Sequence, residues 1–151
     1  MKQIITILLI FTGLLSLAQP PKDGKMKERI RTQKIAFITE KLALTADEAQ
    51  KFWPIYNQFD DTSNKIKSEY FRPIMRKMRR NQDVSDSEAN SFLEQIIEGE
   101  NKMHLAKQKL LKDLKSAIPA KKIIRLKVVE DEFNRQLLKR LEKFKNRRKK
   151  D

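Results

Sequence analysis

The stretch LTADEA, Leu44 to Ala49, sets the division of the sequence into elements, because it has the pattern of a helix N-terminus. Thr45 is followed three positions later by Glu48. At this spacing each side chain can accept a hydrogen bond from the other residue's backbone N–H, which caps the first turn. Leu44 lies just before the cap, where a hydrophobic staple is expected. We therefore predict that a helix begins directly after Thr45.

The same order of residue types occurs again forty residues further on, as VSDSEA at Val84 to Ala89. It predicts a second helix start, capped by Ser85. The sequences around the two stretches do not align, and a repeat protein needs at least three units. We interpret the similarity as recurring capping chemistry.

Composition favours a single helical domain. The chain has 151 residues, of which 36% are charged, with three glycines and no cysteine. Few glycines and many Lys, Glu, Leu, Ile and Gln residues favour helices over sheets. The absence of cysteine excludes disulfides and thiolate metal sites. A net charge of +14 favours anionic partners.

Residues 1–18 differ from the rest of the sequence. Lys2 is followed by an apolar run from Ile4 to Leu17 and then by small residues. This is the pattern of an export signal, and we predict cleavage between Ala18 and Gln19 and a periplasmic mature chain. The alternative, a membrane anchor, needs about 20 apolar residues and is disfavoured by the shorter run. Export also argues against DNA as the anionic partner.

Apolar residues spaced three and four apart predict four amphipathic helices in a single all-α domain over 26–145. One helix should be long and bent, in a hairpin or cradle-like bundle. Before the domain we expect an extended leader at 19–25, and after it a basic tail at 146–151. The helices are expected at 26–41, from Ala46 to about Met78, from Asp86 to about Ala117, and from Pro119 to the tail.

Two prolines fall inside the long second helix. Pro54 and Pro73 each lack a backbone donor and clash with the carbonyl four residues earlier. We therefore expect bends near Gln50 and Glu69. In the third helix, Gly99 should allow a neighbouring helix to come close.

No catalytic group is evident, and we expect a non-enzymatic protein without cofactor or metal. The glycines are too few to form a phosphate-binding loop. His104 is the only histidine; it lies one helical turn from Glu100, but a carboxylate-bridged site in a bundle needs two Glu-x-x-His motifs. The acidic run Glu130 to Glu132 is interpreted as a solvated charged face.

The second helix combines an aromatic stripe with a group of arginines. Each ring taken singly is more often core than surface. Rings left exposed on a concave face would suit unfolded polypeptides, and arginines would collect acidic segments. The candidate apolar contacts are Trp53, Tyr56, Phe59 and Tyr70, and the candidate cationic contacts are Arg72, Arg76, Arg79 and Arg80.

The stretches LTADEAQKFWPIY and LKSAIPAKKIIRLK, with the signal and four-helix plan, resemble the Spy/CpxP group of small periplasmic proteins. Its mark is a Leu-Thr-x-x-Gln motif at a helix start. The sequence is most similar to Bacteroidota relatives labelled "sensor of ECF-type sigma factor", over about Lys27 to Leu141. Leu44 and Thr45 match the motif, but Glu48 replaces its glutamine. The second motif, at Ile118 to Lys122, lacks both the hydroxyl cap and the glutamine.

The resemblance implies an all-helical, cradle-shaped homodimer that works without ATP. It would bind unfolded envelope polypeptides during envelope stress, as a chaperone does. Alternatively it would be a regulatory sensor that acts on an anti-sigma factor and its ECF sigma factor. A further alternative, from charge alone, is a protein that binds lipid or nucleic-acid surfaces through its basic C-terminal end.

Overall fold

The computed structural model describes residues 22–80 and 83–147. The predicted signal and its cleavage site at Ala18 and Gln19 lie outside these residues. The chain divides into two compact units, residues 1–36 and residues 37–151. No strand occurs in the described ranges, which confirms the all-α prediction. The elements are α1 (Lys22–Lys41), α2 (Ala46–Ile66), the π-helix η1 (Lys67–Phe71), α3 (Arg72–Arg79), α4 (Asp86–Leu114) and α5 (Ala120–Arg147).

The two capping stretches begin α2 and α4, as predicted. Thr45 Oγ1 accepts a hydrogen bond from the Glu48 N–H at 3.2 Å, and Glu48 Oε2 accepts one from the Thr45 N–H at 2.8 Å. This reciprocal pair satisfies two amides of the first turn. Ser85 Oγ accepts from the Glu88 N–H at 3.3 Å, while the Glu88 carboxylate accepts from Lys77 instead. Both helix starts are therefore confirmed.

Glu48 has a second partner, at the start of α5. Lys122 Nζ donates to Glu48 Oε2 at 2.6 Å and to the Ala43 carbonyl at 2.7 Å. Ala43 has a φ of 47°, which is uncommon for a residue with a side chain. Glu48 and Lys122 carry opposite charges and contact each other directly, so each neutralises the other.

The second predicted helix is a continuous helical segment made of α2, η1 and α3. α2 passes through Pro54 without a break, so the structure shows no interruption near Gln50. Near Glu69, where a bend was expected, the chain is instead π-helical, and Pro73 follows as the second residue of α3. A wider π turn accommodates a residue that cannot donate to the helical ladder.

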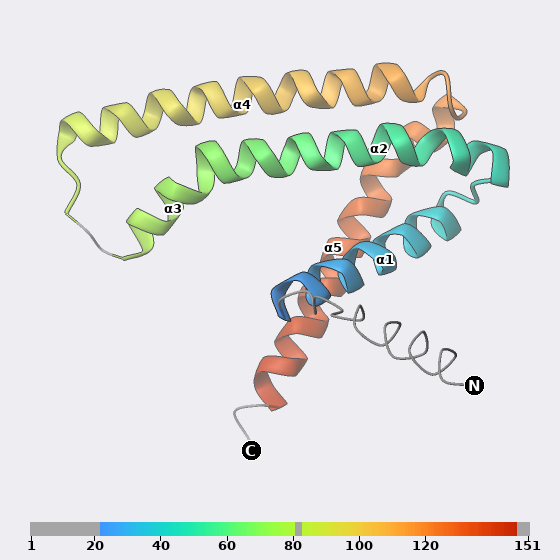
Figure 1. Ribbon diagram of the computed structural model, residues 1–151, viewed down its shortest axis with the longest axis horizontal. Coiled ribbons are helices and arrows are strands. Elements are labelled where there is room, and N and C mark those ends of the chain that lie inside the picture. Colours follow the sequence, from blue (N-terminus) through green and yellow to red (C-terminus); the bar gives the residue numbers. More distant parts are fainter. Residues whose placement is uncertain (1–21, 81–82, 148–151) are drawn as a thin grey trace, which may run out of the picture. The chain divides into compact units, whose positions relative to one another are not determined.

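α4 lies beside α2 and η1 and forms a helical hairpin with them (Figure 1). Gly99 of α4 is buried at this contact. A Cβ atom at Gly99 would lie 2.8 Å from Tyr70 Cβ and 2.8 Å from Phe71 Cζ. Such distances are too short for any side chain, so the close approach predicted at Gly99 is confirmed.

The core of residues 37–151 joins the end of α1 with α2, α4 and α5. Ile38, Phe52 and Leu114 are fully buried, and Val129 is 2% exposed. Burying side chains of this size contributes about 1.5–3 kcal/mol each. The apolar residues of four helical segments, far apart in the sequence, thus form one cluster.

Two predicted boundaries are corrected. α1 begins at Lys22, so residues 22–25 of the expected leader are helical. α5 continues to Arg147, so Asn146 and Arg147 of the expected tail are also helical. Lys22, Lys25 and Arg147 have high helix propensity, which favours both extensions beyond the apolar patterns, although Gly24 and Asn146 do not. Residues 148–151 lie outside the described ranges.

The contact between Glu48 and Lys122 can be tested by a double-mutant cycle. Glu48→Gln and Lys122→Gln should each lower the thermal unfolding midpoint at pH 7, because each leaves one charge without its partner. The double variant should lose less than the sum of the two, as measured by circular dichroism. Additive losses would show that the charges are not coupled.

The same contact predicts a pH dependence. Lys122, and then the Thr45 N–H, hold the pKa of Glu48 below its ordinary value of 4.5. The stabilisation is therefore present above pH 4.5 and is lost as the pH falls through the lower folded-state pKa. The difference in unfolding midpoint between wild type and Glu48→Gln should shrink over that range.

Gly99→Ala should destabilise the protein by about 1–3 kcal/mol, because the added methyl group overpacks the contact with Tyr70 and Phe71. Helix propensity alone predicts the opposite sign, a gain of about 1 kcal/mol. Urea unfolding distinguishes the two. Asn101→Ala, at an exposed position two residues further on, is the control and should be neutral or stabilising. A Gly99→Ala variant as stable as this control would contradict the close approach.

Candidate functional site

Three of the four candidate aromatic contacts pack in or against the core, which is the alternative that the sequence favoured for each ring taken singly. Tyr56 is 2% exposed, and Trp53 and Phe59 are partly buried against the same cluster. The Trp53 ring meets Phe52 edge-on, with centroids 4.9 Å apart. A chain with so many charged residues has few apolar side chains, and these rings are needed to fill the core.

Tyr56 also has a specific polar partner. Its hydroxyl donates to Glu130 Oε1 at 2.5 Å. Burial, reinforced by the Glu130 charge, raises the pKa of Tyr56 above its ordinary value, so the hydroxyl stays neutral and donates. Glu130 was interpreted as part of a solvated acidic face. Its side chain instead joins α5 to α2.

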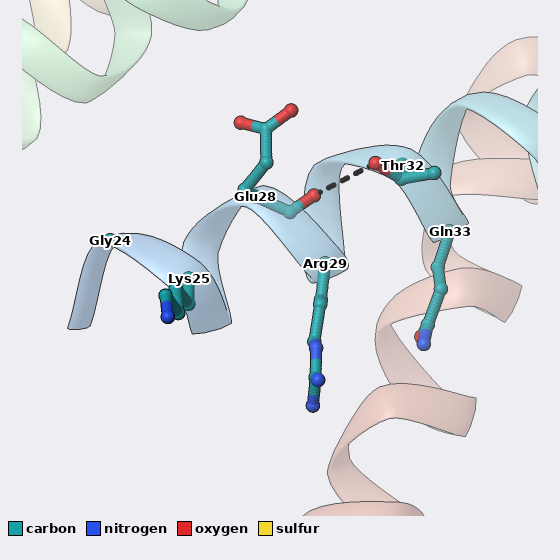
Figure 2. Close-up of a pocket in the computed structure, with 6 residues that line it drawn as sticks. All are labelled: Gly24, Lys25, Glu28, Arg29, Thr32 and Gln33. Atoms are coloured by element: carbon teal, nitrogen blue, oxygen red, sulfur yellow. Dashed lines mark hydrogen bonds between the residues drawn. The ribbon is translucent and has the colours of Figure 1, made fainter. Parts of the chain in front are cut away.

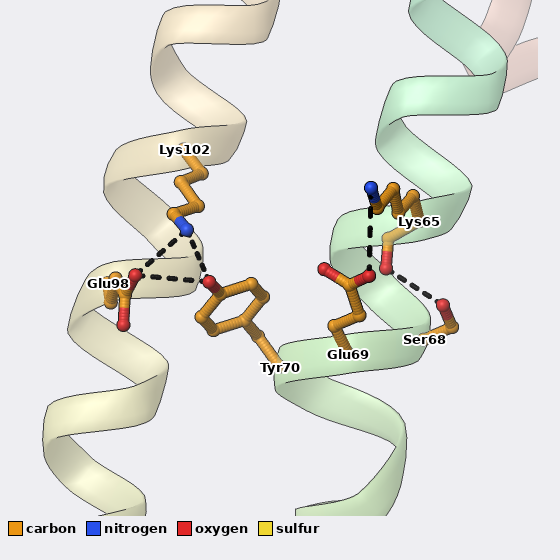
Figure 3. Close-up of polar contacts among 6 residues, drawn as sticks. All are labelled: Lys65, Ser68, Glu69, Tyr70, Glu98 and Lys102. Carbon is orange, nitrogen blue, oxygen red and sulfur yellow. Dashed lines mark hydrogen bonds and ion pairs between the residues drawn. The ribbon is translucent and has the colours of Figure 1, made fainter.

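Tyr70, the fourth predicted ring, connects η1 to α4 (Figure 3). Its hydroxyl donates to Glu98 Oε1 at 3.0 Å and accepts from Lys102, whose Nζ lies 4.7 Å from the ring centroid. Lys102 Nζ also lies 2.8 Å from Glu98 Oε1. Hydrogen bonds to Glu98 and Tyr70 raise the pKa of Lys102, and those from Lys102 and Tyr70 lower the pKa of Glu98. This group is a satisfied structural network.

The four predicted arginines are exposed on one side of α3, with Arg80 at its C-cap. Together with three further residues they line an open groove of about 530 Å³. The residues fall in rows of four-residue spacing, so they share one helical face. None of the described residues that line this groove is acidic. We call this surface the cationic face; it consists of Lys67, Phe71, Arg72, Met75, Arg76, Arg79 and Arg80.

The opposite side of α3 sets the direction of the cationic face. Ile74 is buried, and Lys77 forms an ion pair with Glu88 of α4 and lies 5.6 Å from the Phe92 ring centroid. These contacts fasten α3 to α4 through one side. The arginines are therefore left on the other side, where no ion pair involves them within residues 22–80 and 83–147.

Sequence analysis did not identify Lys67 and Met75 as part of this site. Both precede arginines by four or five residues, and Met75 is 51% exposed. The four-residue spacing of positions 67, 71, 75 and 79 could have identified both residues as members of one helical face. Lys67 was harder to recognise from the sequence, because the π-helical segment changes the helical register between Lys67 and the arginines.

Two other hollows carry no comparable set of side chains. In the unit of residues 1–36, α1 lines an open hollow of about 670 Å³ (Figure 2). Arg29 and Gln33 extend in one direction there, and Thr32 Oγ1 donates to the Glu28 carbonyl at 3.0 Å. A groove of about 430 Å³ beside Tyr70 contains lysines that are each paired with an acidic residue.

Metal-binding side chains do not gather anywhere in the described part of the chain. His104 is exposed, and its Nε2 lies 2.9 Å from the Gln108 side chain. Of the helices that the structure describes, none has the length and apolar character needed to cross a membrane.

The structure thus shows an all-α protein with an exposed basic surface. No protein-family model matches the chain, and no curated protein or solved structure matches it either. The resemblance to the Spy/CpxP group therefore stays a prediction that depends on the motif residues. The function has to be argued from the cationic face.

Tyr56→Phe should lower the free energy of unfolding by about 1–3 kcal/mol, because it leaves the Glu130 carboxylate without its donor. Urea unfolding measures this loss. Tyr70→Phe, which removes a hydroxyl from an exposed network, should cost less. If Tyr56→Phe were neutral, the Tyr56–Glu130 bond would not contribute to the fold.

Proposed function

We propose that this protein is an exported, non-enzymatic polypeptide-binding protein of the Spy/CpxP kind, and that the cationic face is its binding surface. It would hold unfolded or acidic envelope polypeptides in the periplasm without ATP. The observation that supports this most strongly is the exposure of four arginines beside two apolar residues in a groove without acidic side chains.

The side chains of the cationic face suit acidic polypeptides. Guanidinium groups bind carboxylates through two parallel hydrogen bonds, and they keep their charge at any physiological pH. Phe71 and Met75 offer apolar area between the charges, and methionine adapts to ligands of different shape. Positive charge also speeds the encounter with anionic chains. Binding should therefore be broad in sequence and sensitive to salt.

The placement of the aromatic rings in the core changes the expected strength of binding. Tyr56 is buried and Trp53 and Phe59 are partly buried, so these rings offer little contact area and the arginines carry most of the interaction. Exposed ion pairs contribute little individually. The protein would accordingly bind its partners weakly and reversibly, which suits temporary holding.

The alternative is a regulatory sensor that binds one partner, such as the periplasmic part of an anti-sigma factor, through the same face. A pull-down from envelope extract separates the two. Recovery of many unrelated proteins would favour the chaperone-like role. Recovery of one dominant protein would favour the sensor. The resemblance also leads us to propose a homodimer.

Neutralising Arg72, Arg76 and Arg79 by substitution with glutamine should weaken binding to a fluorescent acidic peptide about tenfold, since each exposed ion pair contributes about 0.2–1 kcal/mol. The triple variant should also suppress aggregation of a destabilised client less well. The measurements are fluorescence anisotropy and light scattering on protein purified from the periplasm.

The matched control substitutes glutamine at Lys107, Lys112 and Lys121, which are exposed outside the cationic face. It changes the net charge equally. This control should bind nearly as well as wild type. Equal weakening in both triple variants would show that net charge alone is responsible and that the cationic face is not the site.

A further inference from the structure

Phe71 takes part in two contacts at once. Its side chain lines the groove of the cationic face, and the tip of its ring reaches the site of Gly99 on α4. The ring is partly buried, whereas Arg72 beside it is exposed. Phe71 therefore connects the candidate binding surface to the packing of the helical hairpin.

The position of this ring depends on the absence of a side chain at Gly99. A Cβ atom there would lie 2.8 Å from Phe71 Cζ and 3.2 Å from Phe71 Cε2. Tyr70 meets the same point through its Cβ, which moves only with the backbone, so the Phe71 ring is the group that an added methyl would displace. Gly99 itself is outside the groove, because the described residues that line it belong to η1, α3 and the C-cap of α3.

The π turn brings the ring and the first guanidinium of the cationic face together. The Arg72 N–H donates to the carbonyl of Lys67, five residues earlier, so the turn is wider than an α-helical one. Tyr70 and Phe71, consecutive in the sequence, consequently both reach Gly99. Turns of this kind within helices are frequent at functional sites. Here the turn leaves a packed ring directly beside an exposed arginine.

Met75 extends the apolar part of the groove. It follows Phe71 by four residues, so the two share one helical face at about 6 Å, and its side chain is 51% exposed. We call this pair the apolar seat; it consists of Phe71 and Met75. Arg72 and Arg76 each follow one member of the pair and form the neighbouring row of the face. Such a surface suits a segment in which an apolar side chain adjoins carboxylates.

We infer that Gly99 is a positioning residue for the binding surface. By leaving room for the Phe71 ring against α4 it keeps the apolar seat open, and the seat takes an apolar side chain of the bound acidic segment. This inference rests on the proposed function and adds a selectivity to it. Ring position and ligand affinity are then coupled, so a change at Gly99 alters binding although Gly99 does not touch the ligand.

Two labelled peptides of equal length and equal charge separate the apolar seat from the arginines. One carries leucines among its glutamates, and the other carries serines at the same positions. Wild-type protein should bind the leucine peptide about fivefold more tightly, because an open groove buries part of an apolar side chain. High salt should weaken both peptides but leave the ratio of their dissociation constants nearly unchanged, since salt screens only the ionic contacts. Fluorescence anisotropy measures both constants.

Gly99→Ala should remove most of the preference for the leucine peptide and leave binding of the serine peptide nearly unchanged. Phe71→Ala should do the same. In the Phe71→Ala background, adding Gly99→Ala should change neither dissociation constant, because the ring that the methyl group displaces is gone. A merely structural role of Gly99 would instead weaken both peptides equally in either background. Circular dichroism at the assay temperature shows whether each variant is folded.

A second pair of variants leaves the hairpin contact untouched and serves if Gly99→Ala does not fold. Met75→Ser should also reduce the preference for the leucine peptide. Met78→Ser is the matched control, since Met78 is 52% exposed and does not line the groove. This control should keep the full preference.

The outcomes separate this inference from the proposed function. Equal binding of the two peptides by wild-type protein would overturn the inference, and so would a full preference in folded Gly99→Ala or in Met75→Ser. The arginines would still bind acidic chains in those cases, so the proposed function would stand. If wild-type protein bound neither peptide, the proposed function would fail and this inference with it.

Discussion

Lys122 fastens three parts of residues 37–151 at a single point. Its ammonium group bonds the Glu48 carboxylate and the Ala43 carbonyl, so the first turn of α5 is joined to the first turn of α2 and to the turn before it. Glu48 also caps α2 through Thr45. The group that starts a helix is therefore also the group that places it against another, and the core containing Phe52 and Leu114 forms beneath this junction.

A second constraint acts at the other end of the helical hairpin. Pro73 cannot continue an α-helical ladder, and the chain widens to a π-helix just before it. The π turn packs Tyr70 and Phe71 onto Gly99, where a Cβ atom would force these neighbours to shift. This close contact fixes the rotation of α3, with Ile74 toward α4 and the arginines away from it. The candidate site thus depends on backbone geometry as much as on charge.

The shortage of apolar residues explains where the rings lie. With 36% charged residues, the chain fills its core with the aromatic side chains of α2, and exposed contact surface has to come from arginine and methionine. α5 has one face in the core, while other apolar side chains of the same helix, Ile124, Val128 and Leu138, are exposed. Each helix therefore has a distinct role that its composition alone does not reveal.

The sequence by itself determined the local features: the caps at Thr45 and Ser85 and the close approach at Gly99. These follow from steric limits and hydrogen bonds within a few residues, so they could be predicted without the fold. The four arginines were also found, because charge without nearby acids is visible in a sequence. Only the tertiary structure decided which face of each amphipathic helix meets another. The Tyr56–Glu130 and Glu48–Lys122 contacts join residues 74 positions apart, and helical periodicity shows that a face is apolar without showing what covers it.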